Sequence, residues 1–328
     1  MTPATSIPVV VLSGFLGAGK TTLLRTMLTG DPATAVIVNE YGDVSLDHRL
    51  LRGCAERVEV VSGGCACCVR RTDLVAVLSA LLDDHERGRA ELHGVVIETS
   101  GLADPAPILF TVTGDPMLRH HFDVVRVVVC VDAQGGSRQL AAHPEVLKQV
   151  AVADELVLTK ADLVEPAVCA DLAERLAHLN PAARVVTARN GLRDTVAIAE
   201  PDASRRAARR RPHPDVAAGH VDDTASLFLS PRQPLDWLAF AVWLSMLLAA
   251  WGEQVLRVKG LVELEDGSFV SLNSVQHVVH APEHLSAQAV ADGAAGIVFI
   301  TRGLPIERLK DSLERFQRLS GVPTAVPS

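Results

Sequence analysis

The sequence predicts an α/β protein: a large domain with a mainly parallel, doubly wound sheet, followed by a smaller α+β domain. Near-continuous Val/Ile runs alternate with helical patterns through residues 1–200, which is typical of strands buried on both faces of a parallel sheet. Beyond residue 224, two alternating runs meet at an Asp-Gly step, which is typical of an antiparallel hairpin. An arginine- and proline-rich segment separates the two patterns.

The expected elements follow in chain order. Strands of the first domain are expected at 9–13, 35–39, 58–61, 95–99, 125–132, 155–160 and 184–188, with helices near 19–29 and 72–84 and helical segments between most of the others. In the second domain we expect a helix from about Pro234 to Leu248, a hairpin of 254–264 and 269–279, a strand at 296–300 and an amphipathic helix at 306–319. The predicted domains are therefore 1–200 and 225–328, joined by a solvated linker at 201–224.

Composition limits the partners and the compartment. A net charge of −8 argues against general nucleic-acid binding, which needs a basic surface. The longest apolar stretch, Trp237 to Trp251, is shorter than the roughly twenty residues of a membrane span. We therefore expect a buried helix there, with an exposed partner-docking helix as the alternative. No export signal is evident and the cysteines crowd together, so free thiols and a cytoplasmic location are expected.

The segment GFLGAGKT follows a buried strand and opens a helix, which is the context of a phosphate-binding loop. Its glycines allow backbone N–H groups to surround a phosphate, and the helix start adds a positive dipole. Lys20 is expected to reach the β/γ oxygens, and the Thr21 hydroxyl to ligate Mg²⁺. The predicted nucleotide contacts in this loop are Gly14, Gly17, Ala18, Gly19, Lys20, Thr21 and Thr22.

A second phosphate-side element is expected where the strand at 95–99 ends. Glu98 supplies a carboxylate for Mg²⁺ or its water shell, and Gly101 can bring a backbone N–H to the γ-phosphate. Glu98 therefore joins Lys20 and Thr21 as a predicted catalytic residue. A polar strand end that caps a helix is the structural alternative.

The segment Thr159-Lys160-Ala161-Asp162 is expected to bind the base. The Asp162 carboxylate can accept hydrogen bonds from N1 and N2 of guanine, while the Lys160 stem covers the ring. Adenine has no such pair of donors, so the motif favours GTP and GDP. Thr159 stands where guanine-specific proteins usually carry Asn, and this loses an amide contact.

Three thiols, Cys65, Cys67 and Cys68, lie within four residues on a loop that begins Gly63-Gly64. Thiolates select zinc, copper(I) or tetrahedral cobalt over magnesium, and three of them leave a position open for transfer. Glu40 in the segment NEYGD could complete this site, with a solvated acidic loop as the alternative. The closely spaced His277, His280 and His284 could form another metal site, but surface or core positions are favoured.

In this order, GFLGAGKTT, NEYGD, GGCACC, ETSGLADP and TKAD closely resemble the CobW-type family of metallochaperone GTPases, and the segment with VKG at 258–260 resembles that family's second domain. The resemblance implies a SIMIBI-class GTPase domain that hydrolyses GTP to GDP and phosphate. It also implies binding of Zn²⁺ or Co²⁺ at Cys65, Cys67 and Cys68, with Glu40 as a further candidate ligand. Delivery of that metal to a client metalloprotein is implied as well.

Two other functions stay open at this point. One is a P-loop kinase that uses ATP and a small acceptor, which Asp162 disfavours. The other is a metal sensor that binds nucleotide without turnover. The sequence leaves open the client, the choice between zinc and cobalt, the residue that positions the attacking water, and whether the chain forms a homodimer.

Overall fold

The computed structural model describes residues 6–29, 31–40, 57–62, 71–188, 219–221, 223–229, 235–280, 282–286 and 295–319. The chain divides into two compact units, Met1–Glu174 with Arg184–Arg206 and Arg175–Ala183 with Ala207–Ser328. The predicted boundaries at 200 and 225 stay predictions. Among the described helices, none has the length and apolar character needed to cross a bilayer.

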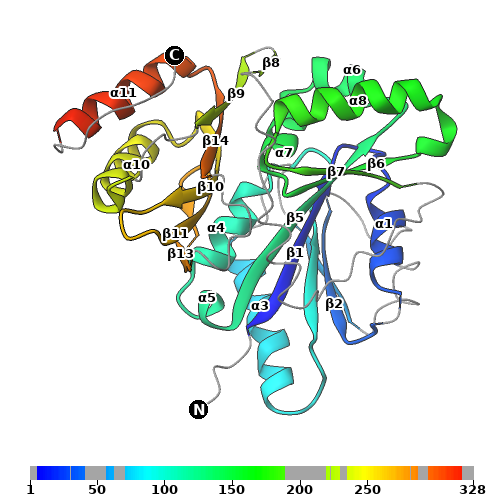
Figure 1. Ribbon diagram of the computed structural model, residues 1–328. Helices are drawn as coiled ribbons and strands as arrows, with labels where there is room; N and C mark the ends of the chain where they lie inside the picture. The colour runs from blue at the N-terminus through cyan, green and yellow to red at the C-terminus, as the bar shows by residue number, and fades with distance from the viewer. Residues whose placement is uncertain are drawn as a thin grey trace. The chain divides into compact units, whose positions relative to one another are not determined.

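A seven-stranded sheet forms the core of the first unit (Figure 1). Its strand order is β3-β2-β4-β1-β5-β6-β7, and every pairing is parallel, which confirms the predicted doubly wound sheet. The strands are β1 (Ile7–Gly14), β2 (Thr34–Glu40), β3 (Val58–Ser62), β4 (Gly94–Glu98), β5 (Phe122–Asp132), β6 (Glu155–Thr159) and β7 (Arg184–Thr187). β1 and β4 are buried along nearly their whole length, as their Val/Ile runs predict.

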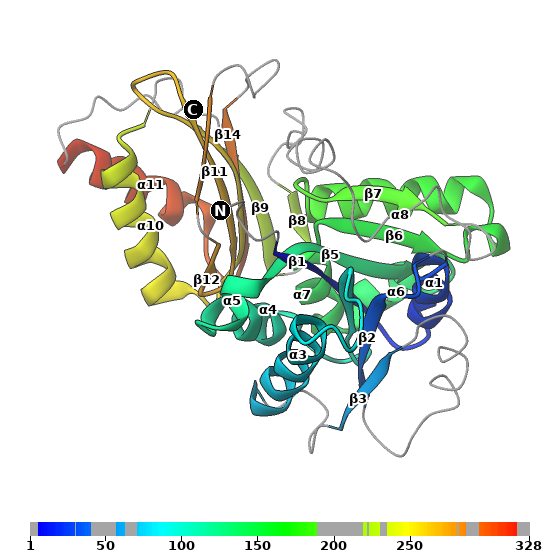
Figure 2. The same ribbon diagram turned by 90° about the horizontal axis from the view of Figure 1, so that it is seen from below.

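Helices pack on both faces of this sheet (Figure 2). Leu23 and Leu24 of α1 join a core cluster with Val10 and Leu12 of β1, whereas α7 packs against β1 and β5. The helices up to residue 179 are α1 (Lys20–Met27), α3 (Arg71–Glu86), α4 (Ala106–Gly114), α5 (Leu118–His121), α6 (Gly136–Ala142), α7 (Pro144–Val152) and α8 (Pro166–Leu179), with a 3₁₀ turn η1 (Ala161–Leu163).

The second unit is built on an antiparallel sheet in the order β12-β11-β10-β14-β9-β8, with β13 paired to β11. The predicted hairpin is confirmed, since β10 and β11 pair from Glu263 and Phe269 onward. Asp266 accepts hydrogen bonds from Ser268, which closes the turn. The elements are β8 (Gly219–Val221), β9 (Thr224–Leu229), α10 (Trp237–Trp251), β10 (Val255–Glu263), β11 (Phe269–Val275), β12 (Val278–Val279), β13 (Glu283–Leu285), β14 (Gly296–Arg302) and α11 (Ile306–Leu319).

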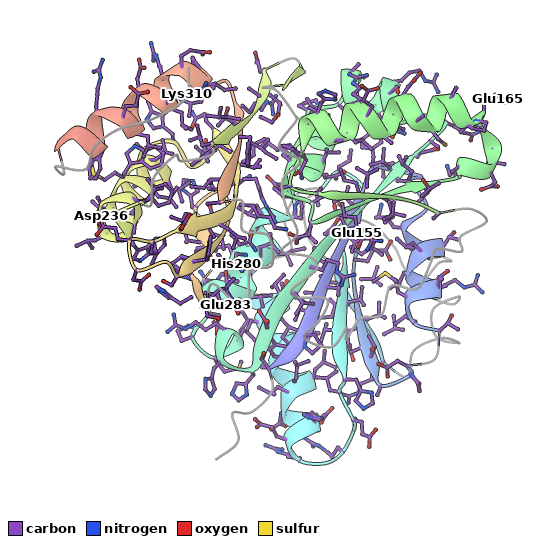
Figure 3. The ribbon with its side chains drawn as sticks, in the orientation of Figure 1. Glu155, Glu165, Asp236, His280, Glu283 and Lys310 are labelled. Atoms are coloured by element: carbon purple, nitrogen blue, oxygen red, sulfur yellow. The ribbon has the colours of Figure 1, made fainter. Side chains whose placement is uncertain are left out.

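Helix α10 begins at Asp236, which Figure 3 labels beside the first turn. The Asp236 carboxylate accepts hydrogen bonds from the N–H groups of Leu238 and Ala239, so it caps the helix. One side of α10 lies in the core, and the other exposes Leu238, Val242 and Met246 at four-residue spacing. The expected helix is confirmed, and it is buried on one face only, whereas docking of a partner on the exposed face stays a prediction.

Strands β8 and β9 were not predicted from the sequence. β8 lies inside the segment predicted as a linker, and β9 follows it within a short run, TASLFL, that has no clear periodicity. β9 is a strand because it pairs with β14 along its whole length. Partners that lie about seventy residues further along the chain leave no signal in a local pattern.

Candidate nucleotide site

The predicted nucleotide residues follow strands whose carboxyl ends lie side by side. β1 is flanked by β4 and β5, so that Leu12 pairs with Glu98 and Gly14 pairs with Cys130. β6 follows β5 at the same edge. In open parallel sheets, ligands bind outside the carboxyl ends of the strands, and the fold therefore gathers these motifs at one place.

The conformation of the phosphate loop depends on its glycines. Gly17 and Gly19 have φ values of 71° and 82°, a left-handed conformation that other residues rarely adopt. Gly19 directly precedes α1, so the loop ends at a helix N-terminus with its unpaired N–H groups and positive dipole. The loop is closed by a hydrogen bond from the Ala18 N–H to the Phe15 carbonyl, 3.1 Å long.

Lys20, Thr21 and Glu98 lie together at this loop. The Lys20 ammonium group donates to the carbonyl oxygens of Gly14 at 2.9 Å and Phe15 at 3.3 Å. The Thr21 hydroxyl donates to Oε1 of the buried Glu98 at 3.4 Å. A hydroxyl and a carboxylate brought together in this way are oxygen donors that suit Mg²⁺. These residues therefore fit the magnesium ion predicted for the site.

The segment after β4 packs directly on the phosphate loop. A Cβ atom placed on Gly101 would lie 2.6 Å from Cδ2 and 2.7 Å from the backbone N of Leu16. Real Cβ atoms do not approach so closely, and only glycine fits. Before it, the Thr99 hydroxyl donates to the Ser13 hydroxyl at 2.8 Å, and this bond ties β4 to β1. The predicted contact of Gly101 with the γ-phosphate stays a prediction.

On the base side, Thr159 is buried and its hydroxyl faces the phosphate loop. The hydroxyl lies 2.8 Å from the carbonyl oxygen of Ala18 and 3.3 Å from that of Val131. Thr159 therefore joins the end of β6 to the phosphate loop. Asp162 lies in η1 with an exposed side chain. Its contact with guanine stays a prediction, as do those of Thr159 and Lys160.

Three further residues of this region were not among the predicted site residues. Asp132, the last residue of β5, forms an ion pair with Lys160 at 2.8 Å. The His143 ring lies 4.5 Å from the Phe15 ring, centroid to centroid. Gln149 donates to two carbonyl groups just after β4. The position of Asp132 at the end of a Val-rich strand is a signal that sequence reasoning could have used, whereas nothing local marks His143 or Gln149.

The predicted thiolate ligands Cys65, Cys67 and Cys68 lie outside the described residues, as does the side chain of Glu40. The backbone of Glu40 pairs with Ser62, the last residue of β3. The strand that precedes the cysteine segment in the sequence therefore ends beside the end of β2. No group of three or more His, Cys, Asp or Glu side chains within the described part of the chain could hold a metal ion.

The histidines of the second unit have separate surroundings. His277 donates from Nδ1 to the Leu248 carbonyl at 3.1 Å, and the His284 ring meets the Trp237 ring edge-on, with centroids 6.3 Å apart. Among the described cysteines, Cys130 is buried in the core cluster of the first unit, as its strand position predicted.

Comparison with known proteins agrees with this site. Residues 8–187 match the family model of the CobW/HypB/UreG nucleotide-binding domain, and residues 224–317 match that of the cobalamin synthesis protein CobW C-terminal domain. The zinc chaperone YjiA of Escherichia coli K12 is 33% identical over 264 residues, which cover 79% of this chain and 82% of that protein. The zinc chaperone CobW of Pseudomonas aeruginosa is 34% identical over 219 residues, covering 56% and 57%.

Among solved structures, a zinc-bound triple mutant of the YjiA GTPase superposes with a TM-score of 0.72. It is 25% identical in sequence, and the alignment covers 95% of this chain and 99% of that one. The likeness therefore includes both the parallel sheet and the antiparallel one. Together the phosphate loop, the strand order and the two family matches show that this chain belongs to the CobW/HypB/UreG family of nucleotide-binding proteins.

Proposed function

We propose that this protein is a GTP-dependent zinc chaperone. It hydrolyses GTP to GDP and phosphate, holds zinc at Cys65, Cys67 and Cys68, and releases it to a client metalloprotein. The observation that carries the proposal is the run of neighbouring strands β3-β2-β4-β1, because the strand that precedes the cysteine segment in the sequence and the strand that precedes the phosphate loop end at the same edge of one sheet.

GTP hydrolysis is supported by the arrangement of Lys20, Thr21 and Glu98 around a phosphate loop. Thr21 and Glu98 would hold Mg²⁺, which would neutralise part of the negative charge of the phosphates. Lys20 places a positive charge at the centre of the loop. The Asp162 side chain is exposed after β6 and would accept hydrogen bonds from the donors of guanine. The solved relative is named a GTPase, which agrees with this assignment.

The coupling between nucleotide and metal is supported by strand register. Val38 pairs with Glu98, and Glu40, two residues further along β2, pairs with Ser62. Ser62 is the last residue of β3, which lies three strands from β1. At the usual spacing between strands, the ends of β3 and β1 are about 14 Å apart. β2 lies between β4, which carries Glu98, and β3, which precedes the cysteine segment. A nucleotide-dependent shift of the end of β2 would therefore change the surroundings of the magnesium site and of the metal site together.

Thermodynamic linkage makes the coupling reciprocal: if GTP tightens zinc binding, zinc tightens GTP binding by the same factor. Zinc is preferred to cobalt here because the curated relatives are named zinc chaperones. Three thiolates leave a fourth position for a ligand from Glu40, from water or from the client, which is what transfer requires.

The test measures the zinc affinity of the reduced protein by competition with a chelator, once in the presence of GDP and once in the presence of a non-hydrolysable GTP analogue. Phosphate release from GTP in the presence of Mg²⁺ is measured on the same protein. Cys67→Ala is the site variant. Cys169→Ala, on α8, is the matched control, since it removes a free thiol elsewhere. We expect tighter zinc binding with the GTP analogue, lost in Cys67→Ala and kept in Cys169→Ala. The same titration with Co²⁺ distinguishes the two metals.

Equal zinc affinity in both nucleotide states would contradict the coupling between nucleotide and zinc and would leave a GTPase whose metal site does not respond to nucleotide. No phosphate release with Mg²⁺ would favour a metal sensor without turnover. Competition by ATP as strong as that by GTP would favour a kinase instead. Only nucleotide-dependent zinc affinity together with GTP turnover supports the chaperone.

A further inference from the structure

Gln149 on α7 is a fully buried glutamine whose amide faces the loop after β4. Its Nε2 group donates to the carbonyl oxygens of Gly101 at 3.1 Å and Ala103 at 3.0 Å. Both amide hydrogens are therefore used by one short segment, residues 101–103. The Oε1 atom of Gln149 is also buried, and it has no hydrogen-bond partner among the described residues.

An unpaired oxygen of this kind argues for a role beyond packing. A buried carbonyl without a donor is costly, and methionine would fill a similar volume without that cost. An amide at this position therefore serves the hydrogen bonds that it makes. Those bonds hold a segment that packs on Leu16 of the phosphate loop and contains Gly101, the predicted γ-phosphate contact.

Helix α7 is well placed to hold this segment in position. The His143 ring before its first turn lies against the Phe15 ring of the phosphate loop. Lys148 lies 3.7 Å from Asp104, the residue that follows the held segment. The helix itself packs on β1 and β5. α7 thus connects the phosphate loop with residues 101–104 through side chains that nucleotide need not touch.

The geometry of the Gly101–Leu102 peptide gives Gln149 a second use. A trans peptide points its C=O and N–H in opposite directions, and no cis peptide occurs in the described residues. Since the Gly101 carbonyl points at Gln149, the Leu102 N–H points away from it. If that peptide plane turns over, the N–H meets α7 instead. The Oε1 atom of Gln149 can then accept a hydrogen bond from the Leu102 N–H.

We propose that Gln149 is a positioning residue that acts as a latch for residues 101–103. Its Nε2 holds the segment in the arrangement described, and its Oε1 accepts a backbone N–H when the γ-phosphate of GTP draws the segment into the other arrangement. The latch rests on the proposed GTPase function. It makes the difference in affinity between GTP and GDP depend on a residue that contacts neither.

The test compares Gln149→Met, which keeps the volume and removes the amide, with Gln254→Met, the same substitution at a half-buried glutamine just before β10. Affinities for GDP and a non-hydrolysable GTP analogue are measured by competition with a fluorescent guanine nucleotide. In Gln149→Met we expect the ratio of the two affinities to change by about five- to tenfold, the effect of one or two neutral hydrogen bonds. Gln254→Met is expected to leave the ratio unchanged.

Loss of both affinities by the same factor in Gln149→Met would overturn the latch, because a packing defect does not distinguish the nucleotides. Should that variant fail to fold, hydrogen exchange on the wild type decides: amide protection across 98–104 must differ between GDP and the analogue, and equal protection overturns the proposal. A wild type that binds neither guanine nucleotide refutes the GTPase function itself. If the wild type and Gln149→Met show the same ratio of affinities for the GTP analogue and GDP, the latch is refuted while the GTPase function still stands.

Discussion

The hydroxyl of Thr159 lies 2.8 Å from the backbone carbonyl of Ala18, so the end of β6 is hydrogen-bonded to the phosphate loop across 141 residues of chain. A Cβ atom on Gly19 would lie 3.6 Å from Thr159, and the two surfaces are thus in contact. Threonine at this position, where guanine-specific proteins usually carry asparagine, thereby braces the predicted phosphate loop.

Replacing Thr159 with valine keeps the shape and removes the donor to Ala18. We expect stability to fall by about 1 kcal/mol and GDP affinity by about five- to tenfold, because a buried carbonyl loses its partner. Nucleotide titration and urea unfolding measure the two effects. Thr113→Val is the matched control, since that hydroxyl bonds only within α4. Unchanged GDP affinity in Thr159→Val would show that the brace does not matter to nucleotide binding.

Gly101→Ala is expected to slow GTP turnover by about tenfold or more, because its Cβ must displace the backbone of Leu16 and, with it, the phosphate loop. Gly114→Ala is the control. A Cβ there would meet only the Phe110 ring at ordinary contact distance, 3.6 Å. Phosphate release at saturating GTP is the measurement. If both variants turn over GTP at the wild-type rate, the segment after β4 tolerates a Cβ atom at residue 101, and the close packing against Leu16 does not limit turnover.

Asp132 holds the ammonium group of Lys160, whose backbone adopts a left-handed conformation with φ of 56°. Asp132→Asn removes the charge that orients this group. We expect GDP and the GTP analogue to lose affinity equally, by about three- to tenfold, because the base side is common to both. The same competition assay measures it, with Asp171→Asn on α8 as the control. A loss confined to the GTP analogue would place Lys160 on the phosphate side instead.

Asp84 makes the attachment of α3 sensitive to acid. Hydrogen bonding to the Arg57 guanidinium, with the positive charges of Arg57 and Arg89 beyond it, holds the pKa of the Asp84 carboxyl below its ordinary value of 3.8. Because the folded pKa is the lower one, the stabilisation is complete above pH 3.8 and is lost as pH falls through the folded value. This ion pair joins α3 to the residue before β3, the strand that leads into the cysteine segment.

Asp84→Asn is therefore expected to lower the urea midpoint at neutral pH, and the difference from wild type is expected to shrink in acid. Urea unfolding between pH 2 and pH 7 measures both effects, because the loss is expected only below pH 3.8. Glu91→Gln, an exposed carboxylate nearby, serves as the control. A difference that stays constant across this pH range would mean that the charge of Asp84 contributes nothing.

The strands of the first unit, the hairpin of the second and the motifs that follow the strands can be predicted from local sequence patterns alone. A Val/Ile run reports a strand buried on both faces, and a glycine-rich turn before a helix reports a phosphate loop, because each pattern is local and needs no knowledge of distant residues. The predicted strands of the first unit, the hairpin turning at Asp266 and the final helix are all present within a few residues of the expected bounds.

Which of these elements lie against one another depends on tertiary packing. β9 is a strand because β14 lies beside it, and Thr159 is a brace because β6 ends next to the phosphate loop. Gln149 faces residues 101–103 because α7 packs over β1 and β5. Such contacts join residues far apart in the chain, and they depend on the strand order β3-β2-β4-β1-β5-β6-β7. The strand order cannot be read from any local periodicity, because it depends on burying the apolar surfaces of all the strands and helices together.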